Sequence, residues 1–284
     1  MKFSHTIFAM PFALIGFMLG IAELKFSNVS IEISGILVRL FLVLFCMVTA
    51  RSAAMAFNRY LDRHFDQLNP RTAIREIPAG IIKAERALYF VVINCLLFTT
   101  ATYFINSICF YLAPVALFVI LFYSYTKRFT YLCHLVLGIG LSLAPIGAYL
   151  AVIGKFDLLP LLFSFAVVFW VSGFDIIYAL QDAEFDKTQA LYSMPSHWGG
   201  ENALKISRIF HFFSVGFVVA AYFIGTFHWL YLVGLLVFIG MLVYQQSIVR
   251  PHDLSKVNLA FMTANGIASI VFSIFVIASI LLTL

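Results

Sequence analysis

The sequence predicts an all-α integral membrane protein, a bundle of nine transmembrane helices around a central cavity. The 284 residues are 63% apolar and only 11% charged, whereas soluble domains carry roughly 25% charged residues. The apolar stretches are about 20 residues long, which suits membrane-crossing helices and not the short alternating strands of a barrel. No soluble domain or linker interrupts them, so we expect a single domain over residues 1–284.

Nine apolar stretches account for most of the chain. They cover approximately residues 5–22, 34–57, 87–105, 108–126, 131–153, 158–181, 204–224, 228–249 and 258–283. The first resembles a signal peptide, but no small-x-small cleavage site follows it, so we expect a retained helix. The second and the sixth end at acidic runs, and the third and fourth are joined by the short link Asn106-Ser107. Lys127 directly follows the fourth, Arg250 directly follows the eighth, and the ninth reaches almost to the last residue.

The distribution of basic residues predicts the orientation. With the N-terminus inside and nine spans, fifteen of the eighteen Lys and Arg residues fall on the inner side, and only Lys25, Arg39 and Lys155 fall outside. The positive-inside rule therefore predicts a cytoplasmic N-terminus. If the number of helices were larger or smaller by one, the Lys and Arg residues would be distributed over both sides of the membrane. This argument favours nine spans.

Two acidic runs lie at the predicted cytoplasmic ends of the second and sixth helices. Their polar residues recur at helical spacing: Asn58, Asp62 and Asp66 in the first, and Asp175, Tyr178, Asp182 and Asp186 in the second. Such spacing places side chains on one face of a helix. Ionised carboxylates are costly beside a bilayer and usually mark function there. Carboxylate and amide oxygens suit Mg²⁺, so two converging acidic faces could hold such ions around a diphosphate.

The two runs also suggest an internal repeat. Asp62 and Asp66 precede Asp182 and Asp186 by 120 residues, and a basic loop containing proline follows each run. Four helices per unit would make the two acidic helices parallel. The pattern therefore predicts two four-helix halves, about 1–126 and 127–249, that meet at the cavity, plus a ninth helix.

Basic residues complete the predicted site. Arg71 and Arg75 follow the first run, and Lys127 and Arg128 end the fourth helix on the same side. Guanidinium and ammonium groups bind phosphate oxygens. Acidic faces with nearby cations indicate a metal–diphosphate site. The alternative is a cation- or proton-coupled transporter, which needs acids near the bilayer midplane and often broken helices.

Other reactive side chains are expected to be structural. The four cysteines form no CxxC pair and lie in apolar segments, so we expect packing residues. Arg63 and Glu184 lie off the main acidic faces and are expected to be solvated, and His64 is expected to be structural.

At these residues the chain resembles the UbiA superfamily of intramembrane prenyltransferases. The two runs are similar to its NxxxDxxxD and DxxYxxxDxxxD signatures, and residues 71–80 are similar to its Arg-rich loop, with Glu76 where proline is common. Residues 8–12 and 125–128 also look like family segments. The second run most resembles the 4-hydroxybenzoate polyprenyltransferase branch, including a related group assigned to a menaquinone route.

The resemblance implies transfer of a polyprenyl group from an isoprenyl diphosphate to a small aromatic acceptor, a 4-hydroxybenzoate or a naphthoate-type ring, in quinone biosynthesis. It implies a Mg²⁺ cofactor held by Asn58, Asp62, Asp66, Asp182 and Asp186. It also implies that Arg71, Arg75, Lys127 and Arg128 hold diphosphate or an acceptor carboxylate, and that Asp175 and Tyr178 lie near the reacting carbons. Stabilised diphosphate departure would leave an allylic cation for the ring to attack. We expect an inner-membrane enzyme with a cytoplasmic active site, no nucleic-acid ligand and no obligate protein partner.

Overall fold

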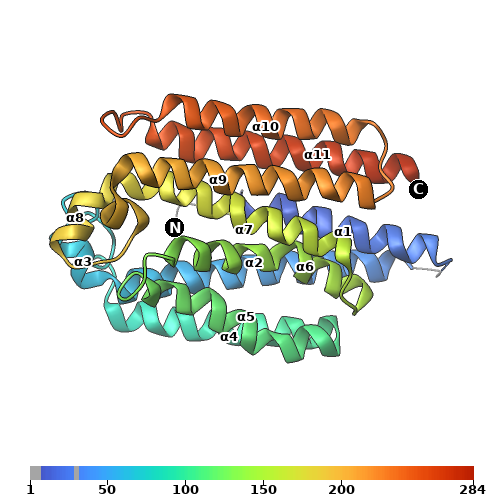
Figure 1. Cartoon of the computed structure of the whole chain (residues 1–284). Coiled ribbons are helices and arrows are strands. Elements are labelled where there is room, and N and C mark those ends of the chain that lie inside the picture. The colour runs from blue at the N-terminus through green and yellow to red at the C-terminus, as the bar shows by residue number, and fades with distance from the viewer. Residues whose placement is uncertain (1–7, 29–31) are drawn as a thin grey trace.

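The computed structural model describes residues 8–28 and 32–284, and over these residues nine helices are long and apolar enough to cross a membrane. Figure 1 shows them lying side by side in one bundle. The long helices are α1 (Ala9–Phe26), α2 (Ile33–Leu61), α4 (Ala84–Ile105), α5 (Ser107–Thr126), α6 (Cys133–Ile153), α7 (Leu158–Ala179), α9 (Met194–Ile224), α10 (Leu230–Ile248) and α11 (Asn265–Thr283). The prediction of an all-helical fold with nine spans is confirmed.

Short elements lie at one end of the bundle, at the left of Figure 1. They are α3 (Arg63–Leu68) and α8 (Ala183–Thr188), the latter preceded by a 3₁₀ turn at Leu180–Asp182. Each acidic run is therefore broken, and its carboxylates do not share one continuous helical face. Asp62 and Asp182, both with ψ close to 0°, immediately precede the two short helices. Spacing by four residues does not reveal such a break, because the short helix restores the same periodicity after it.

Two helix boundaries differ clearly from the predicted ones. α9 begins at Met194, ten residues before the apolar stretch, because Ser193 and Ser196 form a reciprocal capping box. Gly199, with φ of 77°, then kinks the helix. α1 runs to Phe26, beyond the predicted end at residue 22, and the predicted start at residues 5–7 lies outside the described residues.

The core is aromatic and lies among α1, α7, α10 and α11. Phe12, Trp170, Phe238 and Phe272 are fully buried there, and their ring centroids lie 5.2–6.4 Å apart where they contact one another. α1 also approaches α6 closely, since a Cβ on Gly16 would lie 1.9 Å from the carbonyl oxygen of Pro145. This packing fixes α6 and α7, which form one wall of the cavity described below.

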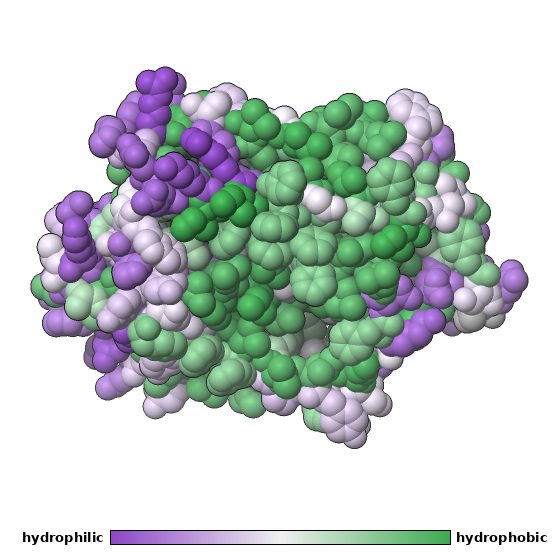
Figure 2. All heavy atoms as spheres, in the orientation of Figure 1, coloured by the Kyte–Doolittle hydropathy of each residue, from purple (hydrophilic) through white to green (hydrophobic). Residues whose placement is uncertain are grey.

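The exterior matches a bilayer. Figure 2 shows a broad hydrophobic face between two polar ends, and the larger polar end carries α3 and α8. Exposed Phe, Leu and Ile side chains are abundant on the helices of this face. A surface that contacts lipid must be made of apolar side chains.

Candidate active site

A cavity of about 290 Å³ opens at the end of the bundle that carries α3 and α8. Its walls come from α2, α3, the loop after α3, α5, α6, α7 and the turn before α8. Nine predicted site residues line it: Asn58, Asp62, Asp66, Arg71, Arg75, Lys127, Asp175, Tyr178 and Asp182. The remaining two, Asp186 and Arg128, join the same group through ion pairs with Lys127 and Asp62.

Arg71 ties the first half of the chain to the second. Its guanidinium makes a two-pronged ion pair with Asp182, in which Nε donates to Oδ1 at 3.0 Å and Nη2 contacts Oδ2. Nη1 donates to the Tyr178 hydroxyl at 2.9 Å, and Asn69 Nδ2 donates to Asp182 Oδ1 at 3.1 Å. Burial alone would lower the pKa of Arg71, but Asp182 outweighs it and raises that pKa, so the guanidinium stays charged.

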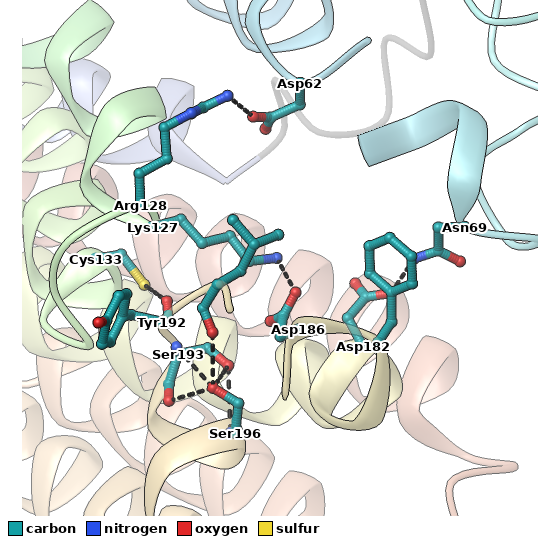
Figure 3. A network of polar contacts seen from close by, with 12 residues as sticks. Asp62, Asn69, Lys127, Arg128, Cys133, Asp182, Asp186, Tyr192, Ser193 and Ser196 are labelled. Atoms are coloured by element: carbon teal, nitrogen blue, oxygen red, sulfur yellow. Dashed lines mark hydrogen bonds and ion pairs between the residues drawn. The ribbon is translucent and has the colours of Figure 1, made fainter. Parts of the chain in front are cut away.

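A second cross-link joins the end of α5 to α8 (Figure 3). Lys127 Nζ lies 2.7 Å from Asp186 Oδ1, and the Asp186 side chain is 0% exposed. Burial would lower the pKa of the Lys127 ammonium, but the carboxylates around it, led by Asp186, raise its pKa above the usual value. Arg71 and Lys127 thus tie the loop after α3 and the end of α5 to the second acidic run.

The first acidic run carries its own cations. Arg128 Nη2 lies 2.9 Å from Asp62 Oδ1, and Arg75 Nη1 lies 2.6 Å from Asp66 Oδ1. Asn58 Nδ2 donates to Asp62 Oδ2 at 3.0 Å, which orients that carboxylate. Burial raises the pKa of Asp62 above its usual value, with Arg128 opposing the shift.

The donor atoms suit a hard divalent cation. Among the described residues, no three His, Cys, Asp or Glu side chains converge as a ready metal site, because the carboxylates point at cations. Asp66 Oδ2 is nevertheless buried with no hydrogen-bond partner. Mg²⁺ typically takes one or two protein carboxylates and fills its remaining positions with water and substrate phosphates. The residues present therefore fit Mg²⁺ bound together with a phosphate ligand.

Arg51, His134 and Asn69 are among the cavity residues that were not predicted from the sequence. Arg51 lies on α2 seven residues before Asn58, and its Nε atom is buried without a hydrogen-bond partner. His134 on α6 lies 2.7 Å from Asp175, and Asn69 contacts Asp182. The sequence did offer a signal for Arg51, since this basic residue lies inside an apolar span and on the same helical face as Asn58. It was interpreted only as an indicator of membrane orientation.

A second, apolar cavity of about 350 Å³ continues from the first into the bundle. α2, α4, α5 and α6 line most of it, and it extends as far as Phe156 beyond the opposite end of α6. Arg51, Met55, Tyr123, Leu137 and Leu141 line both cavities, so the polar and apolar spaces meet there. Figure 2 shows a recess in the hydrophobic face where α5 and α6 lie in Figure 1. The arrangement suits a ligand with an anionic head and a long hydrocarbon tail.

Known proteins match this chain over most of its length. The sequence profile of the UbiA prenyltransferase family matches residues 9–267. The 4-hydroxybenzoate octaprenyltransferase of Tolumonas auensis is 30% identical over 226 residues, which is 78% of both chains. The apo structure of a UbiA homologue from Aeropyrum pernix superposes with a TM-score of 0.81 at 26% identity, covering 100% of this chain and 99% of that one. A UbiA homologue from Archaeoglobus fulgidus, bound to DMAPP and Mg²⁺, has the same fold, with a TM-score of 0.71 at 21% identity and coverage of 97% and 95%.

Proposed function

The chain belongs to the UbiA prenyltransferase family, and we propose that it transfers a polyprenyl group from an isoprenyl diphosphate to 4-hydroxybenzoate or a related hydroxylated aromatic carboxylate. One observation carries the proposal: a charged cavity and an apolar cavity meet inside one integral membrane protein. The first matches a diphosphate, and the second matches an isoprenoid tail. The 4-hydroxybenzoate relatives support the choice of acceptor class.

The cavity residues would bind the diphosphate by exchanging partners. In the structure Arg71, Arg75 and Lys127 are held by aspartates. Phosphate oxygens offer these cations equivalent bidentate or point-charge contacts. The released carboxylates of Asp62, Asp66, Asp182 and Asp186, with the Asn58 amide, would then hold Mg²⁺. When bound, the metal supplies positive charge that compensates the charge developing on the leaving diphosphate.

Arg51 is placed to select the acceptor. Its guanidinium lies where the two cavities meet, and its Nε atom has no hydrogen-bond partner. A guanidinium that lines a cavity is a strong site for a carboxylate. The acceptor would therefore bind with its carboxylate on Arg51 and its ring beside the first carbon of the prenyl chain. The apolar walls around it would keep water from the allylic cation.

The proposal includes an orientation and an internal symmetry. The charged cavity would face the cytoplasm from the inner membrane, with the N-terminus on the same side, because the excess of basic residues lies at that end. Asp62 and Asp182 take equivalent places before α3 and α8, which supports two related halves of four spans each.

Product analysis with the purified protein tests the proposal. The protein in lipid nanodiscs is incubated with Mg²⁺, a radiolabelled polyprenyl diphosphate, and either 4-hydroxybenzoate or a dihydroxynaphthoate. A prenylated aromatic product is expected with one of them, and Asp182→Asn should abolish its formation. The matched control is Glu184→Gln, because Glu184 is exposed between the two aspartates, and it should retain activity.

Two results would reject the assignment. One is a folded wild-type protein that consumes no prenyl diphosphate with any of the acceptors. The other is ion flux in proteoliposomes without diphosphate consumption, as the transporter alternative requires. The position of the acidic residues already favours the enzyme, since they gather at one end of the bundle with α3 and α8 and not at its centre.

A further inference from the structure

Asp175 differs from the other aspartates of the cavity in its partner. Asp62, Asp66, Asp182 and Asp186 pair with arginine or lysine, as described above, whereas Asp175 pairs with His134. His134 Nδ1 lies 2.7 Å from Asp175 Oδ2. A histidine, unlike an arginine or a lysine, need not place a permanent positive charge against the carboxylate that it contacts.

The contacts of His134 determine its tautomer. The backbone N–H of Met194 donates to His134 Nε2 at 3.3 Å. A backbone amide can only donate, so Nε2 carries a lone pair and the proton of the neutral imidazole lies on Nδ1. Nδ1 therefore donates to Asp175. This bond fixes the direction in which the carboxylate points.

The pair formed by His134 and Asp175 lies where α6 packs on α7. His134 is 3% exposed, and the Ser172 hydroxyl on α7 donates to the His134 carbonyl oxygen at 3.1 Å. One turn along α6, a Cβ on Gly138 would lie 2.4 Å from the carbonyl oxygen of Val168. The two helices are therefore as close as glycine permits, and the imidazole is buried beside this contact.

Asp175 faces the reaction space. Its side chain is 22% exposed, and it lines the charged cavity together with Tyr178 and Arg51. An acceptor whose carboxylate is bound by Arg51 would thus share the cavity with the carboxylate of Asp175. The geometry combines a buried positioning group with a base that is open on the side of the substrate.

We propose that Asp175 is the proton acceptor for the ring hydroxyl of the aromatic substrate and that His134 is the residue that positions it. The proposal rests on the function proposed above. The bond between the prenyl carbon and the diphosphate oxygen breaks, and the diphosphate leaves with the electron pair. A ring carbon then bonds to the prenyl carbon while Asp175 takes the hydroxyl proton, which gives a neutral dienone. The hydrogen on the attacked carbon leaves as a proton, Asp175 returns its proton to the oxygen, and one proton is released in total.

Separating ionisation of the donor from attack by the ring tests the assignment. Ionisation is followed by the exchange of ¹⁸O from the bridging to the non-bridging positions of a labelled prenyl diphosphate, and ring attack is followed by product formation. Asp175→Asn should retain the isotope exchange and lower kcat for product by at least about 100-fold, the usual effect of losing a general base. His134→Leu should lower kcat about 10- to 100-fold with little change in the KM of either substrate.

A conservative variant and a control distinguish positioning from packing. His134→Asn keeps an N–H close to Asp175 and should recover most of the activity lost in His134→Leu. His252→Asn, on the exposed loop after α10, should match the wild type. Equal losses in both His134 variants, or Asp175→Asn with near-normal product formation, would overturn the proposal. Loss of isotope exchange in Asp175→Asn would also overturn it, because Asp175 would then serve the ionisation step.

The wild-type protein provides a measurement that does not depend on variant folding. An acceptor with a methoxy group in place of the hydroxyl has no proton to give to Asp175, and its turnover should fall at least about 100-fold. Methoxy turnover close to that of the hydroxyl acceptor would defeat the inference while leaving the proposed function intact. Failure of the function itself would appear differently, as absence of both isotope exchange and product in the wild type.

Discussion

Replacing Lys127 by methionine is expected to destabilise the folded protein by about 3–5 kcal/mol, the usual cost of removing one partner of a buried ion pair. The reason is the asymmetry of the pair. The Asp186 side chain is 0% exposed, whereas the Lys127 side chain is 33% exposed. Without the ammonium at 2.7 Å, the carboxylate has neither a counter-charge nor access to water.

The reverse change should cost less. Asp186→Asn leaves an ammonium that is partly hydrated and still senses the charges of Asp182 and Asp62, so we expect a loss of about 1–2 kcal/mol. The double variant Lys127→Met/Asp186→Asn removes both charges and should be more stable than Lys127→Met alone. All three variants should be inactive, because both side chains belong to the proposed diphosphate site.

Reversible unfolding of the four proteins in mixed micelles, followed by tryptophan fluorescence and circular dichroism, measures these differences. A coupling energy of at least about 2 kcal/mol between the two substitutions is expected from a double-mutant cycle. Additive losses would show that Lys127 does not compensate the charge of Asp186. A Lys127→Met protein as stable as the wild type would refute the reasoning directly.

Three further results are expected. Arg51→Met should raise the KM of the acceptor at least about tenfold without changing that of the prenyl diphosphate, since Arg51 lines both cavities where they meet. Equal rises in both KM values would contradict this role. Gly16→Ala should lower the free energy of unfolding by about 1–3 kcal/mol, because the added methyl group would overlap Pro145. Gly216→Ala is the control, since nothing lies within 4 Å of its added methyl group, and thermal unfolding compares the two variants. Chelation with EDTA should stop diphosphate consumption and added Mg²⁺ should restore it, whereas consumption that survives chelation would exclude a metal-dependent site.

The fold follows from the sequence because its dominant signals are long and local. Apolar stretches of about 20 residues and the clustering of basic residues at every second boundary fix the number of spans. The start of α9 escaped prediction, because its first turn is polar and depends on the Ser193 cap. The breaks at Asp62 and Asp182 escaped for another reason, since residues on both sides keep helical spacing.

The site was predictable from its two acidic runs and hidden where it depends on single long-range contacts. The spacing of the two runs is visible in the sequence, and the proposed repeat predicts that they meet. His134 carries no such signal, because its partner Asp175 lies 41 residues away on another helix. Arg51 was not predicted, because a basic residue in a membrane protein can be accounted for by the positive-inside rule alone.

The pattern of ion pairs indicates how the binding of the prenyl diphosphate and the binding of the metal depend on each other. Asp62, Asp66, Asp182 and Asp186 are each paired with one cation, so these charges compensate one another. A diphosphate alone would draw the arginines and Lys127 away and leave the carboxylates uncompensated. A divalent cation alone would occupy the carboxylates and leave those cations crowded together. Since an unpaired buried charge is costly, the aspartates and the cations are expected to exchange partners together, which couples donor binding to metal binding. The ion pairs seen in the structure would then be the contacts that make the site accept only the metal–diphosphate complex.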